Sequence, residues 1–201
     1  MDTLISLSWV QGFLVCSASQ NMFGRFISKR NARSITCALF QTYFLYNAWY
    51  IFLYNSKNSR ELLVENINNM YGYFIYDTVC IFTEYFDGGY LVHHIISIII
   101  IDSFKKTDAL DVFYPNIICI FLESPSPLLN IRPMLRNYPE ITHINNTIIY
   151  WSYFFLRIIA FPIISISYLS NNDSDYTKIF GSCLIIIYTA SLYWFVKIAK
   201  L

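Results

Sequence analysis

Long apolar runs follow one another through almost the whole of this 201-residue chain. A helix needs about 20 mostly apolar residues to cross the hydrocarbon core of a bilayer, and several of the runs reach that length. Charged residues make up 13% of the chain, against roughly 25% in an ordinary soluble domain. So little charge leaves little surface to face water. The sequence therefore predicts an all-α, multi-pass transmembrane helical bundle.

The apolar runs give seven candidate spans, or six if the first one lies on the membrane surface. They cover residues 4–21, 35–54, 69–86, 89–102, 110–122, 147–168 and 176–199. The fourth and fifth are short, which suits positions inside a bundle, where neighbouring helices shield them from lipid. A re-entrant pair within residues 72–102 is the alternative for this region.

No linker or repeat divides the chain, so residues 1–201 are expected to form a single transmembrane domain with its core at about 35–200. The first run lacks the basic flank of a cleaved signal peptide and is expected to remain as a helix. With seven spans, one side of the membrane receives eight Lys and Arg residues and the other receives five. The positive-inside rule then predicts a cytosolic C-terminus and a lumenal N-terminus.

Overall charge and cysteine usage exclude other classes. The formal net charge of +1 gives no basic surface for nucleic acid. The five cysteines lie singly inside apolar runs, where they are expected to act as small packing residues. No metal site is predicted, because adjacent histidines on a helix are poorly placed to bind one ion together.

Charged or ionisable groups lie within the apolar runs and at their ends, and six of them need an explanation. Each charged group at membrane depth costs on the order of 2.5–3.5 kcal/mol on insertion scales, so such groups face the bundle interior and find partners there. Helical spacing puts Asp77 and Glu84 on one stripe, and the same spacing relates Asn116 to Glu123. We expect these groups to line a shared internal cavity. The six are Asp77, Glu84, His93, His94, Glu123 and Arg157.

The histidine pair is the strongest chemical candidate, because a carboxylate that orients an imidazole makes it a base or nucleophile. Ser97 lies within one helical turn of both histidines and could hydrogen-bond to either. Counting helix rise from the Asp87–Gly89 turn places Asp77 too deep, and ranks Glu123 first, Glu84 second and Asp77 third as the histidine partner. A purely structural polar cluster, with Arg157 as the counter-charge of Asp77 or Glu84, is the alternative.

A proline-rich stretch follows the fifth run. Residues 125–139 contain four prolines together with Arg132 and Arg136. Proline removes backbone donors that lipid cannot replace, so this stretch is not expected to span the membrane. We expect a cytosolic loop that closes the cavity mouth and brings one of the two arginines near lipid phosphates.

Three motifs, in order, resemble the TLC-domain family. They are GYFIYD at 72–77, LVHHIISIIII at 91–101 and LESPSPLLNIRPML at 122–135, and Arg33-Ser34 before a strong span fits as well. The family includes the ceramide synthases, which join a fatty acyl chain from acyl-CoA to a sphingoid base. The synthases carry a His-Asp-x-x-Asp element in a later helix. This chain has Glu123-Ser124-Pro125-Ser126-Pro127 in its place, which resembles the smaller TLC-domain proteins.

The resemblance implies a barrel of six helices around a tunnel for an acyl chain, with the histidine pair inside. The implied partners are membrane lipids and a fatty acyl chain, in the endoplasmic reticulum or another internal membrane, with acyl-CoA as candidate substrate and no cofactor. The candidate catalytic residues are His93, His94, Glu123, Asp77 and Glu84. The candidate substrate-binding residues are Ser97, Asn116, Asn130, Arg132 and Arg157.

Two readings without acyl transfer stay open at this point. The first is a non-catalytic lipid sensor that regulates membrane lipid composition. The second is a small transporter that uses the polar stripe as a proton relay. Inverted repeats would favour the transporter, and the sequence shows none.

Overall fold

The computed structural model describes residues 2–54, 59–84, 88–106, 113–171 and 175–200, and within these ranges the chain is helical with no strand. The α-helices are α1 (Asp2–Phe23), α2 (Lys29–Tyr54), α3 (Ser59–Glu84), α4 (Gly88–Lys106), α5 (Phe113–Glu123), α6 (Ser126–Ile131), α7 (Pro139–Ser152), α8 (Phe161–Asn171) and α9 (Asp175–Ile198). A 3₁₀ segment, η1 (Arg132–Asn137), follows α6, and a π-helical segment, η2 (Tyr153–Ala160), joins α7 to α8. The all-α prediction is confirmed.

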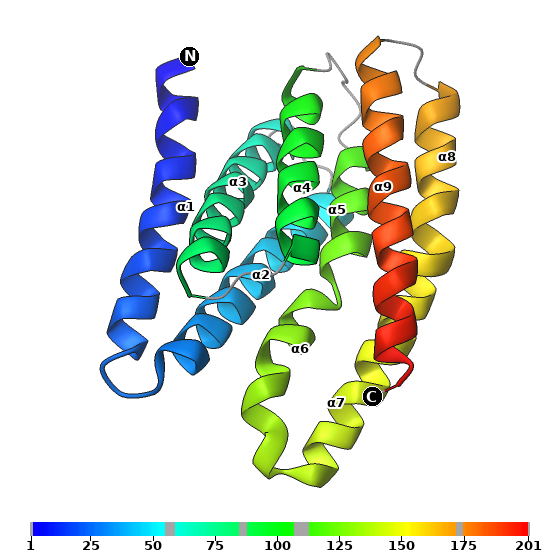
Figure 1. The fold of residues 1–201 in the computed structure, drawn as a ribbon. Coiled ribbons are helices and arrows are strands. Elements are labelled where there is room, and N and C mark those ends of the chain that lie inside the picture. Colours follow the sequence, from blue (N-terminus) through cyan, green and yellow to red (C-terminus); the bar gives the residue numbers. More distant parts are fainter. Residues whose placement is uncertain (1, 55–58, 85–87, 107–112, 172–174, 201) are drawn as a thin grey trace.

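The helices run up and down, so that the two termini lie at opposite ends of the bundle (Figure 1). Successive legs are α1, α2, α3, α4, the broken leg α5–α6–η1, the continuous leg α7–η2–α8, and α9. These seven legs follow the order of the seven apolar runs, and the number of spans stays a prediction. The continuous leg has 33 residues, which corresponds to about 50 Å of helix.

Two segments that are polar in sequence are helical in the structure. α3 begins at Ser59, ten residues before the apolar run that indicated it, because Leu63 and Ile67 on its first turns pack into the core. The proline-rich stretch was expected to be a loop, and this is wrong, because it forms α6 and η1; that it does not span the membrane stays a prediction. Its prolines fall in the first turns of α6, η1 and α7, where a helix does not need their missing N–H groups.

The outer surface of the bundle is strongly apolar. Large hydrophobic side chains are exposed along the long legs, for example Leu39, Ile163, Ile166 and Ile185. Two described helices, Pro139–Asn171 and Phe180–Ile198, are long and apolar enough to cross a membrane, and Gly88–Asp102 is a shorter apolar helix. Polar groups are buried instead, which is the distribution expected of a protein whose solvent is lipid.

α1 packs against α3 through backbone contact. A Cβ atom added to Gly12 would lie 2.6 Å from the backbone oxygen of Asn69, and one added to Gly72 would collide with the backbone of Trp9. Small residues let membrane helices approach this closely. Farther along, the Tyr76 hydroxyl donates a hydrogen bond of 2.5 Å to Gln20. α1 is therefore a packed member of the bundle.

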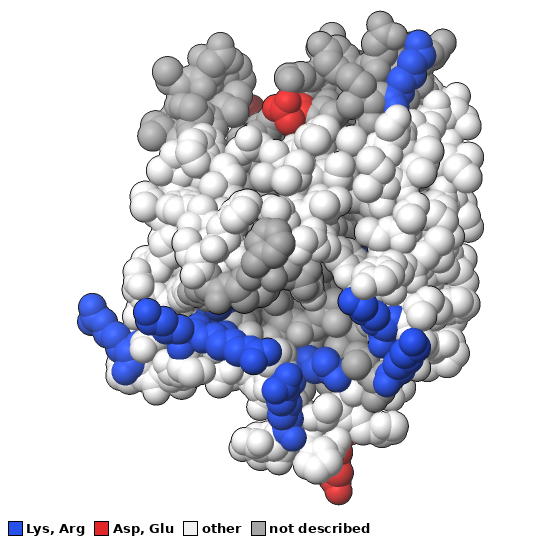
Figure 2. Space-filling view, viewed as in Figure 1, with Lys and Arg blue, Asp and Glu red and all other residues white. Residues whose placement is uncertain are grey.

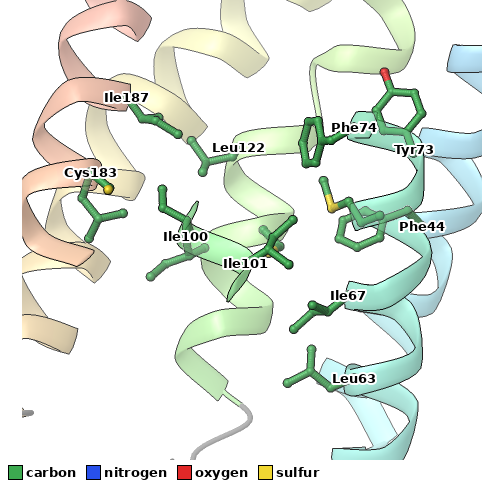
Figure 3. Packing of buried hydrophobic residues seen from close by; sticks show 14 of the residues in the cluster. Phe44, Leu63, Ile67, Tyr73, Phe74, Ile100, Ile101, Leu122, Cys183 and Ile187 are labelled. Carbon is green, nitrogen blue, oxygen red and sulfur yellow. The ribbon is translucent and has the colours of Figure 1, made fainter. Parts of the chain in front are cut away.

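The apolar core fills the half of the bundle in which α3 and α9 begin. Figure 3 shows side chains from α2, α3, α4, α5 and α9 meeting there, among them Phe44, Ile67, Ile100 and Ile187. Tyr73, Phe74 and Leu122 lie at the end of this core. Beyond them, towards the other half of the bundle, the facing side chains become polar.

Candidate functional site

A cavity of about 900 Å³ occupies the half of the bundle that contains the C-terminus. Its wall comes from six legs of the fold, and α1 does not contribute. The lining residues are Lys29, Arg30, Arg33, Ser34, Gln41, Tyr73, Phe74, Asp77, Tyr90, His93, His94, Glu123, Ser126, Leu129, Asn130, Pro133, Tyr153, Arg157, Trp194, Lys197 and Ile198. In Figure 2, a row of Lys and Arg side chains crosses this end of the molecule.

Asp77 on α3 lies between an arginine and a histidine. Its Oδ1 accepts hydrogen bonds from Nε and Nη2 of Arg33, at 2.9 and 2.5 Å, and the Cys37 thiol lies 3.5 Å away. Its Oδ2 lies 3.4 Å from Nε2 of His94 on α4. The counter-charge of Asp77 is therefore Arg33, and the expectation that Arg157 fills this role is wrong.

The predicted ranking of histidine partners is also wrong, because Asp77 rather than Glu123 lies beside His94. The error comes from counting helix rise from the turn. α3 ends at Glu84 and α4 begins at Gly88, so Asp77 and His94 are almost equally far from their helix ends. Counted in this way, their depths differ by only about 1.5 Å.

His93 faces the cavity from the same helix turn but has a different environment. Its ring meets the indole of Trp194 edge-on at a centroid distance of 5.2 Å, and Phe74 at 6.2 Å. Its Nδ1 is enclosed and has no hydrogen-bond partner among the described residues. His94, in contrast, has Asp77 near Nε2 and the Thr78 hydroxyl 3.5 Å from Nδ1. The pair therefore consists of one imidazole with polar neighbours at both ring nitrogens and one whose buried Nδ1 lacks a partner.

Gln41 on α2 connects Glu123 to the rest of the wall. Its amide nitrogen donates to Glu123 at 3.3 Å and to the Tyr73 hydroxyl at 3.0 Å. Its amide oxygen accepts a 2.7 Å hydrogen bond from Asn130 on α6. Arg33, Cys37 and Gln41 follow one another at intervals of four residues, so one stripe of α2 serves both carboxylates.

Arg157 lies in η2 and is 3% exposed. Its Nη2 donates to the carbonyl of Leu122 and, at 3.1 Å, to the hydroxyl of Ser126. Its Nη1 donates to the Tyr153 hydroxyl at 3.3 Å, and the guanidinium lies over the Tyr153 ring. Arg157 thus ties the break between α5 and α6 to the long leg, where a π-helical turn presents it.

The other predicted site residues divide into two groups. Asn130 lines the cavity, whereas Ser97, Asn116 and Arg132 are not among its lining residues. Asn116 donates to the carbonyl of Ala48, and Arg132 donates to Asn146. Glu84 ends α3, and its side chain lies outside the described part of the structure.

Several lining residues escaped sequence reasoning, namely Lys29, Arg30, Gln41, Tyr73, Phe74, Tyr90, Ser126, Tyr153, Trp194 and Lys197. Gln41 could have been identified in the sequence because it lies on the same stripe of α2 as Arg33. The aromatic residues carry no such signal, because tyrosine and phenylalanine are abundant throughout the chain. Within the described ranges, no three His, Cys, Asp or Glu side chains are arranged to hold a metal ion.

The fold and cavity define a class: a multi-pass helical membrane protein with a histidine and carboxylate-lined cavity that is basic at one end. Residues 35–200 match the sequence profile of the TLC domain, so the chain belongs to the TLC-domain family. The match begins in α2 and leaves α1 outside. None of the curated proteins or solved structures compared with the chain matches it. Family membership indicates a function related to membrane lipids.

Proposed function

We propose that this protein binds a fatty acyl chain in an internal tunnel that continues from the cavity, and that it transfers the acyl group from acyl-CoA to a lipid amine. The observation that carries the proposal is the histidine pair in the cavity wall, with His94 beside the Asp77 carboxylate and His93 with no partner for its Nδ1 among the described residues. The volume of about 900 Å³ is at the upper end of the ~300–1,000 Å³ typical of ligand pockets.

The charge of the cavity favours an anionic substrate head. Five Lys or Arg residues line it against two carboxylates, Asp77 and Glu123. Lys29, Arg30 and Lys197 are exposed at the mouth, where phosphate groups of coenzyme A would find charge-assisted hydrogen bonds. This end is the cytosolic side in the orientation expected from the Lys and Arg distribution, and cytosol is where acyl-CoA would enter.

The chemistry assigned to the pair is general base catalysis. The amine nitrogen attacks the thioester carbonyl carbon, and collapse of the tetrahedral adduct breaks the C–S bond with the electron pair leaving on sulfur. His93 takes the proton from the nitrogen and returns it to the thiolate. His94, positioned by Asp77, packs beside His93 at a ring-centroid distance of 5.6 Å and fixes its orientation.

The test is N-acylation by the purified protein in lipid nanodiscs, with palmitoyl-CoA and a sphingoid base or another long-chain amine. We expect His93→Ala to lower turnover by roughly 10²–10⁴-fold, the usual contribution of a positioned base. His143→Ala is the matched control, because His143 is an exposed histidine on α7 and its loss should leave turnover unchanged. No amide product from the wild type with any amine would exclude the transferase.

The second candidate is a non-catalytic lipid sensor that regulates membrane lipid composition. It is favoured by the completeness of the Asp77 cluster, in which Arg33, Cys37 and His94 already surround the carboxylate without a ligand. Lipid profiling of cells that express the wild type or His93→Ala separates the two. A sensor keeps its effect on membrane composition in the variant, and a transferase loses it. Residence in the endoplasmic reticulum and a role in sphingolipid metabolism belong to the transferase proposal.

A further inference from the structure

Arg157 is a buried cation in the cavity wall whose hydrogen-bond acceptors are all neutral. They are the carbonyl of Leu122 and the hydroxyls of Ser126 and Tyr153. In the described part of the chain its Nε has no partner, and Tyr153 accepts from one of the two N–H groups on Nη1. Among the described residues, the ion pair of the cavity joins Asp77 to Arg33, and Arg157 takes no part in it.

A guanidinium at this depth is costly unless something balances its charge. Glu123 lines the same cavity and interacts with Arg157 electrostatically, with the Ser126 hydroxyl between them, but the described side chains form no direct hydrogen bond or ion pair with each other. The three neutral acceptors hold Arg157 in place, and Glu123 offsets its positive charge only from beyond direct contact. A fixed, water-poor positive charge of this kind is suited to stabilising negative charge that develops during a reaction.

We propose that Arg157 binds the carbonyl oxygen of the acyl thioester and stabilises the oxyanion formed from it, an inference that rests on the proposed function. When the amine nitrogen attacks the carbonyl carbon, the C=O π pair moves onto oxygen, next to the guanidinium. Collapse restores the C=O bond and expels the thiolate. The exposed cations at the cavity mouth bind the phosphates, and the enclosed Arg157 serves the reacting carbonyl.

Two matched analogues of palmitoyl-CoA test this assignment by equilibrium binding to the protein in nanodiscs. One is a ketone, in which a methylene replaces the sulfur and the carbonyl is kept. The other is a thioether that lacks the carbonyl oxygen. We expect the wild type to bind the ketone about tenfold more tightly, the effect of one hydrogen bond to a charged group. Arg157→Gln should bring the two affinities within about twofold.

Lys197→Gln is the matched control, because it removes a cation at the mouth and should weaken both analogues by the same factor. If the wild type binds both analogues equally, or if Arg157→Gln keeps the ketone preference, the role of Arg157 is overturned and the proposed function stands. If the wild type binds neither analogue, the proposed function fails and the role of Arg157 fails with it.

A second variant covers the case in which Arg157→Gln does not fold. Tyr153→Phe removes the hydroxyl acceptor of Nη1 and keeps the aromatic ring beneath the guanidinium. It frees an N–H group for the ligand, so the preference for the ketone should be kept or should increase. Loss of the preference in Tyr153→Phe would contradict the proposal.

Discussion

The two halves of the bundle are built from the same helices but are held together in different ways. In one half, α3 contributes Leu63 and Ile67 to a closely packed apolar core. In the other half, two to three turns farther along, it contributes Tyr73 and Asp77 to a cavity. Packing stabilises the first half, whereas ion pairs and amide hydrogen bonds stabilise the second. The polar half therefore keeps its open space because specific partners, not filled volume, fix its walls.

Removing the Asp77 carboxylate should have the largest effect on stability. Asp77→Ala leaves Arg33 and His94 without their shared partner, and breaking a buried pair in this way costs about 3–5 kcal/mol of unfolding free energy. Glu61→Ala is the control, because Glu61 is an exposed carboxylate on the same helix. Reversible unfolding in detergent micelles measures both. An equal, small loss in the two variants would show that Asp77 does not hold the polar half together.

Truncating a side chain in the apolar core should lower the free energy of unfolding slightly less than Asp77→Ala does. Ile118 on α5 is fully buried, and Ile118→Ala should lower the free energy of unfolding by about 2–4 kcal/mol through lost contacts and the cavity left behind. Ile185→Ala, on the lipid-facing side of α9, should be nearly neutral. Ligand binding by the folded Ile118→Ala protein should match the wild type. A change in affinity would mean that the two halves are coupled.

Loss of the Gln41 amide should have an intermediate to small effect. Gln41→Leu leaves hydrogen-bonding groups of Glu123 and Asn130 without a partner. Each unpaired buried polar group lowers the free energy of unfolding by about 1–3 kcal/mol. The neighbouring Thr42 provides the control, because its hydroxyl bonds only to the Ala38 carbonyl within α2. Thr42→Val should therefore be nearly silent in the same unfolding assay. If Gln41→Leu is equally silent, the amide network is not what fixes the wall around Glu123.

The smallest stability effect is expected at the mouth of the cavity. Lys197 lies over the Tyr193 ring and is exposed, so Lys197→Gln should change the free energy of unfolding by less than about 1 kcal/mol. The affinity of the Lys197→Gln variant for acyl-CoA should nevertheless be lower than that of the wild type, and the difference should be larger at low than at high ionic strength. Salt-dependent binding measurements check this. An unchanged affinity at low salt would show that the basic mouth does not bind the substrate head.

The helical architecture and the polar residues that line the cavity were predictable from the sequence, because apolar length and intramembrane charge carry large free energies. Asp77, His93, His94, Glu123 and Arg157 all lie in the cavity wall where their cost in lipid required partners. The partners themselves were less predictable. Arg33 is 44 residues from Asp77, and neither helical spacing nor composition indicates which helices pack side by side.

The errors have a common physical origin. The ranking that placed Asp77 last depended on helix rise counted through a turn, where a shift of a few residues reverses the order. Gln41 was missed because it carries no charge to mark it within its apolar run, although a buried amide also needs hydrogen-bond partners. The proline-rich stretch looked like a loop because its prolines were counted without regard to their positions in the first turns of helices.

The glycine contact between α1 and α3 affects the order in which the helices assemble during translation. Gly12 and Gly72 bring the backbones of α1 and α3 together. The surface of α3 against which α1 packs is therefore absent until α3 has been synthesised, some sixty residues later. α1 must therefore enter the bilayer early and wait beside the growing chain. A factor that binds the first helix during translation and later releases it would then control whether the bundle assembles.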